Sequence, residues 1–186
     1  FTNRNGIDIS CIGKGYHFMT SLIKTDLLSK EEIIEGYNKV AVLYPHVPPL
    51  SLWRAWEYAA YKKFKISGRI LDVGCGDGRY FKLIWPEIKN VVGVDMDAAV
   101  VSLARESGIY ETVHHTVANS IAEPSSSCDH AFANCSLEHM DHLDDVLSEI
   151  SRCLRPSGTL VCSVVTNRFV EWSLLSRLIA LAGSTE

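Results

Sequence analysis

The sequence predicts an α/β fold, in which parallel strands form one doubly wound sheet that helices cover on both faces. Short apolar runs alternate with helical patterns from about residue 68 onward, as they do where crossover helices join parallel strands. These runs are apolar throughout rather than at every second residue, which indicates a sheet buried on both faces. The first run leads directly into three closely spaced glycines, Gly74, Gly76 and Gly78.

The first third of the chain predicts helices. Ser29 stands three residues before Glu32, which is the spacing of a capping box, and apolar residues then recur at helical intervals. Three prolines interrupt the chain within residues 45–49. Ser51 can cap a second helix over residues 52–64.

Strands and helices alternate in the remainder. We expect five strands, at residues 70–73, 91–94, 114–117, 129–133 and 159–165. The clearest helical patterns between them cover residues 98–107 and 143–154. The chain therefore divides into an N-terminal helical cap, residues 1–65, and a ligand-binding core, residues 66–186.

The glycine spacing distinguishes two classes of ligand. Residues 70–80, ILDVGCGDGRY, run from a buried strand through the glycines into a helix. A dinucleotide site has the spacing G-x-G-x-x-G, with a pyrophosphate at the helix N-terminus. Here the spacing is G-x-G-x-G, and Arg79 stands where a small residue is needed. Asp72 and Asp77 flank the loop and suit a cationic ligand such as S-adenosylmethionine. A tight turn that binds no ligand is the alternative.

The segment Leu71–Gly78, LDVGCGDG, resembles the first motif of class I S-adenosylmethionine-dependent methyltransferases. The resemblance extends over about residues 69–165, and it implies a Rossmann-like fold with S-adenosylmethionine as cofactor and S-adenosylhomocysteine as product. That fold usually ends in an antiparallel pair of strands, which we expect to be missing here. The chain starts at Phe1 and ends shortly after an apolar segment, residues 169–179, so we expect a fragment whose apolar segment packs on the sheet or forms a lid.

Two segments that follow strands supply candidate contacts to the nucleoside. Asp95 lies 17 positions after Gly78 and can accept hydrogen bonds from both ribose hydroxyls, while Met96 can pack on the adenine. The alternative for Asp95 is a helix cap, which Asp97 explains equally well. Asn119 stands where the family commonly has an aspartate that contacts the adenine amino group. Its alternative is an asparagine that satisfies the backbone of a turn.

The segment from residue 128 to 139 resembles the family's fourth motif. The resemblance implies that Asn134 and Cys135 form the floor near the methionine part of the cofactor. His139 is a candidate general base at the rim, needed only where the acceptor loses a proton; the alternative is that it caps or packs a helix start. We expect no metal site, because Glu138, His139 and His142 lack the H-E-x-x-H order and an evident third ligand.

The expected cofactor-binding residues come from all of these segments: Asp72, Gly74, Cys75, Gly76, Gly78, Asp95, Met96, Asn119, Ser120, Asn134 and Cys135. The predicted function is methyl transfer to a small-molecule acceptor, through an oxygen, nitrogen or carbon atom. One alternative is a truncated or degenerate module that binds the cofactor without turnover. A dinucleotide-dependent oxidoreductase is a further alternative, which Arg79 disfavours.

Composition excludes several other classes. The 186 residues are 47% apolar, which suits one folded domain, and the net charge of −4 argues against nucleic acid as a partner. No stretch reaches the roughly 18 apolar residues that a membrane span requires. None of the six cysteines stands in a C-x-x-C pair, so we expect a reducing, cytoplasmic location without a zinc knuckle. The sequence leaves the oligomeric state open.

Overall fold

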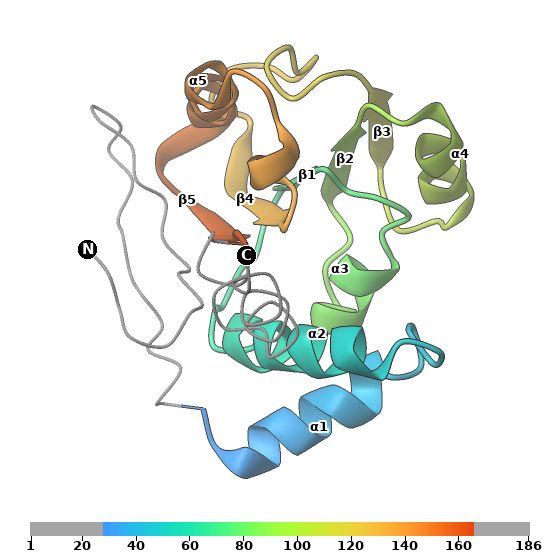
Figure 1. The fold of residues 1–186 in the computed structure, drawn as a ribbon. Coiled ribbons are helices and arrows are strands. Elements are labelled where there is room, and N and C mark those ends of the chain that lie inside the picture. Colours follow the sequence, from blue (N-terminus) through green and yellow to red (C-terminus); the bar gives the residue numbers. More distant parts are fainter. Residues whose placement is uncertain (1–27, 166–186) are drawn as a thin grey trace, which may run out of the picture.

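A computed structural model describes residues 28–165 (Figure 1). Five parallel strands form one sheet in the order β3-β2-β1-β4-β5. The strands are β1 (Ile70–Val73), β2 (Val91–Asp95), β3 (Thr112–His115), β4 (Cys128–Asn134) and β5 (Leu154–Ser163). The strand order reverses direction at β1, so the predicted doubly wound α/β sheet is confirmed.

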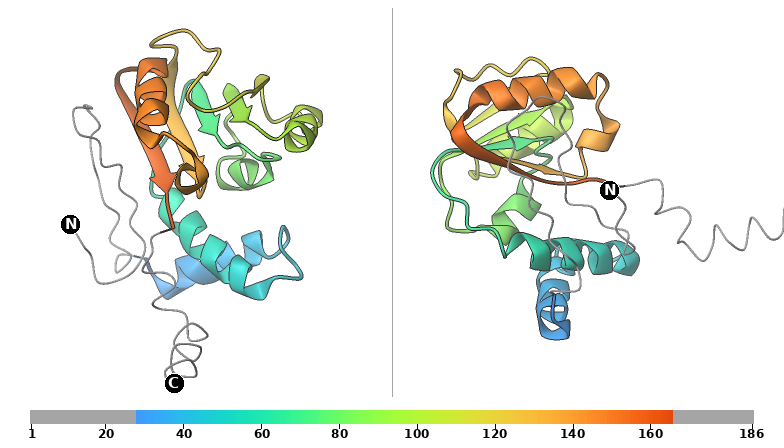
Figure 2. Two further views of the ribbon diagram at one scale, coloured as in Figure 1. Left: turned by 45° about the horizontal axis from the view of Figure 1, so that its top comes forward. Right: turned by 90° about the vertical axis from the view of Figure 1, so that its left-hand side faces the viewer.

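Helices cover both faces of the sheet. They are α1 (Lys30–Val40), α2 (Pro48–Tyr61), α3 (Arg79–Ile84), α4 (Ala98–Glu106), α5 (Leu143–Cys153) and the short 3-10 helix η2 (Leu137–His139). Helix α5 lies over one face, and α2 and α3 lie over the other (Figure 2). Helix α1 packs on the outer side of α2.

Local capping signals account for two helix starts. The hydroxyl of Ser29 accepts a hydrogen bond from the N–H of Glu32, and the Glu32 carboxylate accepts one from the N–H of Ser29. This reciprocal pair confirms the predicted capping box. Asp97 caps α4 by accepting from the N–H groups of Ala99 and Val100.

The predicted start of the second helix is wrong. Helix α2 begins at Pro48, with Val47 as its N-cap residue. Ser51 lies inside the helix, and its hydroxyl donates to the carbonyl oxygen of Tyr44 at 2.9 Å. A proline suits the first helical position because its fixed φ is helical and its missing N–H would have no partner there.

Two strand boundaries also differ from the prediction. Strand β3 covers residues 112–115 rather than 114–117, because its register opposite β2 starts with Thr112 beside Val92. Strand β5 starts early, at Leu154, and its pairing with β4 is irregular before Thr159. The predicted helix at residues 169–179 and the predicted loss of a terminal antiparallel pair lie outside the described residues.

An aromatic cluster joins α2 and α3 to the sheet. Phe132 of β4 is 2% exposed, and its ring centroid lies 5.0 Å from that of Tyr61, 5.1 Å from Trp85 and 5.7 Å from Phe81. The three contacts are edge-on, the arrangement that the ring quadrupoles favour. Helix α2 therefore shares one hydrophobic core with β4. Within residues 28–165, no helix is both long and apolar enough to cross a bilayer.

Replacing the central ring of this cluster tests the shared core. We expect F132A to lower the free energy of unfolding by about 3–5 kcal/mol, since it removes a buried ring and leaves a cavity. The matched control V42A changes a side chain that is 77% exposed, and we expect less than about 0.5 kcal/mol from it. Denaturant unfolding measures both, and a loss below 1 kcal/mol for F132A contradicts the described packing.

Candidate functional site

The glycine loop, residues 74–78, continues the backbone pairing of β1 and β2 beyond both strands. The N–H groups of Gly74 and Cys75 both donate to the carbonyl oxygen of Val94, at 2.8 and 3.1 Å. The three glycines of the loop have φ angles of 71°, 56° and 78° in chain order. Residues with a side chain rarely adopt such angles. The glycines thus permit the turn that sets the loop against the end of β2.

Asp95 at the end of β2 reaches this loop directly. Its Oδ2 accepts a hydrogen bond from the N–H of Gly76 at 3.0 Å, and its Oδ1 accepts one from the N–H of Asp97 at 3.0 Å. A carboxylate offers about four acceptor positions, so two backbone donors leave capacity for the hydroxyls of a ligand. The two parts of the predicted site, the loop and the acid, are therefore adjacent.

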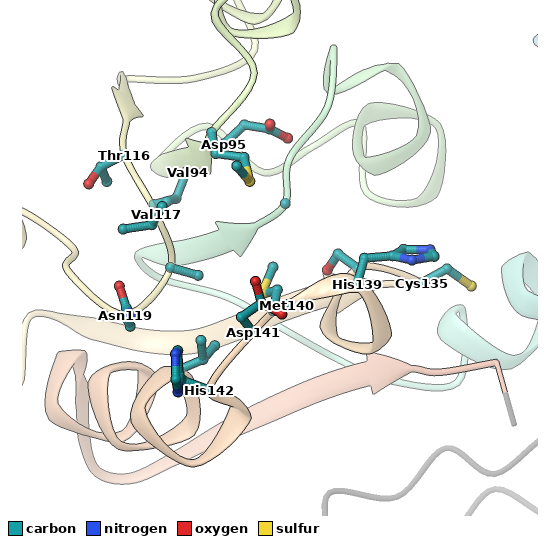
Figure 3. A pocket seen from close by; sticks show the side chains of 15 residues that line it. Val94, Asp95, Thr116, Val117, Asn119, Cys135, His139, Met140, Asp141 and His142 are labelled. Atoms are coloured by element: carbon teal, nitrogen blue, oxygen red, sulfur yellow. The ribbon is translucent and has the colours of Figure 1, made fainter.

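A cavity of about 550 Å³ opens beside the loop at the carboxyl ends of the strands (Figure 3). This volume lies within the range of small-molecule sites. The position suits a ligand as well, because doubly wound sheets bind ligands where the strand order reverses. The lining residues are Gly74, Val94, Asp95, Met96, Thr116, Val117, Ala118, Asn119, Cys135, Ser136, His139, Met140, Asp141, His142 and Val146.

Six predicted residues line the cavity together: Gly74, Asp95, Met96, Asn119, Cys135 and His139. Figure 3 shows His139 and Cys135 at one end, and Asn119 and His142 toward the other. The ends therefore differ in chemistry, because a thiol and an imidazole mark one end and a side-chain amide and an imidazole mark the other. Met96 is 70% exposed, so its thioether is accessible to a flat ring at the mouth of the cavity.

The other predicted residues stand outside the lining: Asp72, Cys75, Gly76, Gly78, Ser120 and Asn134. Asp72 and Cys75 are only 3% and 8% exposed. Asn134 faces α2, where its Oδ1 accepts a hydrogen bond from the hydroxyl of Tyr61 at 2.9 Å. A Cβ added at Gly76 would meet no atom within 4 Å, which leaves open space in front of the loop for a cofactor.

Ser136 was not predicted, although it lies within the segment that supplied Cys135 and His139. Its hydroxyl donates to the carbonyl oxygen of Val73 at 2.8 Å. A Cβ added at Gly74 would lie 2.5 Å from the Cβ of Ser136. Ser136 thus fixes the end of β1 against the segment that follows β4. No sequence signal identifies this role, because the two residues are brought together only by the pairing of β1 with β4.

A buried carboxylate connects α2 to Cys135, which lines the cavity. Glu57 is 1% exposed and accepts hydrogen bonds from Arg54 Nη1 at 2.7 Å, Ser163 Oγ at 2.7 Å and Cys135 Sγ at 3.0 Å. A buried charge is costly unless such donors surround it. Burial and the nearby Glu57 carboxylate raise the pKa of the Cys135 thiol to about 12, so this thiol carries its proton at neutral pH.

The backbone of Cys135 is also unusual. Its φ of 47° places it in the left-handed region, which costs a residue with a side chain on the order of 1–3 kcal/mol. The N–H of Cys135 donates to the carbonyl oxygen of Ser163 at 3.0 Å, which holds the conformation. The chain thereby turns away from β4 and enters η2, the element that carries His139.

Two other ligand classes find less support in the geometry. Residues 28–165 contain no cluster of three side chains that could hold a metal ion. Arg79, at the start of α3, is 66% exposed and pairs with Asp77 at 2.6 Å. A charged, solvated side chain therefore occupies the position where a dinucleotide site requires a small residue against the strand.

The fold and the site together define a Rossmann-like domain with a cavity of about 550 Å³ at the carboxyl ends of its strands. Residues 71–162 match the methyltransferase domain family. A solved S-adenosylmethionine-dependent methyltransferase from Thermotoga maritima is 26% identical, with a TM-score of 0.54, over 67% of this chain and 56% of that chain. The chain belongs to the class I S-adenosylmethionine-dependent methyltransferase family.

Curated relatives include two O-methyltransferases. A malonyl-[acyl-carrier protein] O-methyltransferase of Pectobacterium atrosepticum is 23% identical over 144 residues, which are 77% of this chain and 56% of the relative. A ubiquinone biosynthesis O-methyltransferase of Actinobacillus pleuropneumoniae is 30% identical over 118 residues, 58% of this chain and 50% of the relative. The chain spans about half the length of the curated relatives it matches.

The contact between Gly74 and Ser136 can be tested against backbone strain alone. We expect G108A to lower the free energy of unfolding by about 1–2 kcal/mol. Gly108 has a φ of 66°, but the space around its Cβ position is open, so only backbone strain contributes. We expect G74A to lower the free energy of unfolding by clearly more than G108A does. The φ of Gly74, 71°, is similar to that of Gly108, but Ser136 also occupies the space of the new methyl group. Denaturant unfolding of both variants decides the point, and equal losses contradict the described contact.

Proposed function

We propose that the chain forms the cofactor-binding core of an enzyme that transfers the methyl group of S-adenosylmethionine to a small-molecule acceptor. The observation that carries this proposal is the contact between the glycine loop and Asp95 beside a cavity of nucleoside size. Family membership alone leaves the acceptor open, since one fold supports many chemistries.

Each part of the cofactor has candidate partners in this arrangement. We infer that the glycine loop, residues 74–78, holds the methionine part and that Asp95 accepts hydrogen bonds from the ribose hydroxyls. Asn119 offers a side-chain amide to the adenine, and the exposed Met96 offers a flat apolar contact to the same ring. Negative charge at Asp95 and Asp141, which also lines the cavity, suits a cationic ligand.

The protein's task in the transfer is chiefly to position the acceptor. The bound sulfonium supplies an activated methyl group, so the carbon–sulfur bond breaks as the acceptor's electron pair forms the new bond. Holding the acceptor in line lowers the entropic part of the barrier. The thiol of Cys135, which keeps its proton at neutral pH, is a poor nucleophile there and does not compete for the methyl group.

An oxygen atom is the acceptor that the relatives favour. Both relatives described above are named as O-methyltransferases, which supports an oxygen acceptor here. The net charge of −4 gives no basis for binding nucleic acid. The thiols of Cys75, Cys128, Cys135 and Cys153 are free, which supports a reducing, cytoplasmic compartment.

Titration with S-adenosylhomocysteine by calorimetry tests the cofactor assignment. We expect D95A to weaken binding about 10- to 100-fold, because hydrogen bonds to a charged group contribute about 1.5–3 kcal/mol. D97A is the matched control, since Asp97 caps α4 and lies outside the cavity lining. It should lower stability by about 1 kcal/mol and leave the affinity unchanged.

The outcomes of this titration separate the competing functions. Failure of the wild-type protein to bind S-adenosylhomocysteine excludes the proposal. Binding without turnover against any acceptor supports a cofactor-binding module instead. Binding with equal loss in D95A and D97A indicates that Asp95 acts on the fold of this region rather than on the ribose.

We propose His139 as the general base for an acceptor that loses a proton. With a hydroxyl acceptor, H139Q should lower kcat by about 10²- to 10⁴-fold. H46Q is the control, because His46 is exposed and lies outside the cavity lining. An unchanged kcat in H139Q contradicts the assignment.

A further inference from the structure

Tyr110 contacts the glycine loop but does not line the cavity. It lies in the segment between α4 and β3 and is partly buried. Its hydroxyl donates to Asp72 Oδ2 at 2.7 Å and lies 3.3 Å from the carbonyl oxygen of Cys75. One side chain thus touches both the end of β1 and the start of the loop.

The tyrosine ring fits against two glycines. A Cβ added at Gly78 would lie 2.5 Å from Cε2 of Tyr110, so the ring would have to move. One added at Gly93 of β2 would lie 2.9 Å from Cys75 Sγ and 3.1 Å from Cδ1 of Tyr110, so the sulfur and the ring would both have to shift. The ring therefore occupies space that exists because both positions lack a side chain, and the loop, β2 and Tyr110 pack as one unit.

The partner of the hydroxyl is a buried acid. Asp72 is 3% exposed, and this burial raises its pKa to about 7, an effect that the Tyr110 hydrogen bond opposes and the Asp95 charge reinforces. The other titratable group beside it is the thiol of Cys75, whose pKa burial raises. Asp72 does not line the cavity, so it acts on a ligand there through its charge and through the loop in front of it.

We propose that Tyr110 is a positioning residue for the cofactor, which holds the Asp72 carboxylate and the glycine loop in the arrangement that binds a cationic ligand. The inference rests on the proposed function. Its physical basis is that a hydrogen bond to the ionised acid favours the ionised form, and negative charge behind the loop attracts the sulfonium and ammonium in front of it. Tyr110 donates the only hydrogen bond to the Asp72 side chain described within residues 28–165.

Calorimetric titration with S-adenosylmethionine, at several pH values on both sides of neutrality, tests this inference with Y110F. The wild-type affinity should fall as the pH drops through about 7, because Asp72 then loses its charge. In Y110F the fall should begin about one pH unit higher, so that the affinity at pH 7 is about fivefold weaker, because the ionised fraction of Asp72 drops from about one half to about one tenth. The affinity for S-adenosylhomocysteine, which lacks the sulfonium charge, should fall less over the same pH range. Y58F, a tyrosine of α2 outside the cavity lining, should match the wild type.

D72N completes a double-mutant cycle. Its affinity should show no fall near neutral pH, and adding Y110F to it should change the affinity little.

The outcomes that overturn the inference are distinct from failure of the proposed function. A Y110F protein with a lowered Tm and the wild-type pH profile shows that Tyr110 only packs. Equal pH-dependent losses for the two ligands show that the Asp72 charge does not act on the sulfonium. Absence of binding by the wild-type protein at every pH removes the proposed function, and this inference with it.

Discussion

The site depends on backbone pairing that persists after β1 and β2 have ended. Two successive N–H groups, of Gly74 and Cys75, converge on the carbonyl oxygen of Val94. This pairing sets the glycine loop beside Asp95, whose carboxylate then accepts from the loop itself. The cavity, the contact of Ser136 with Gly74 and the packing of Tyr110 all require the loop to lie beside the end of β2. Main-chain geometry therefore comes first, and the ligand-facing side chains follow from it.

The parts of the structure that local chemistry determines were predictable from the sequence. A capping box satisfies the free N–H groups at a helix start, so Ser29 and Glu32 identify it without reference to the rest of the fold. The glycine loop is local as well, since positive φ angles restrict its residues. Element ends were harder to place, because they depend on tertiary pairing. Strand β3 is offset from its apolar pattern since its register is fixed by β2.

The residues that sequence reasoning missed act through distant partners. Glu57 resembles an ordinary charged residue of a helix, and only the ends of β4 and β5 reveal its donors, Cys135 and Ser163. Tyr110 lies in a connecting segment without any periodic pattern, and its partner Asp72 is 38 positions away. Asn134, expected at the cavity floor, instead pairs with Tyr61 of α2. Such contacts follow from the assembled fold, which no short stretch of sequence encodes.

Strand β5 has a consequence for anyone who prepares this domain. It is one edge of the sheet formed by the described strands, and with Leu154–Ser163 it is also the longest of them. A recombinant polypeptide that stops at residue 165 would present the outer row of main-chain donors and acceptors of β5 to solvent. Such an edge is a template for pairing between molecules and for aggregation. The residue at which an expression clone ends therefore affects aggregation of the protein as well as its catalytic activity.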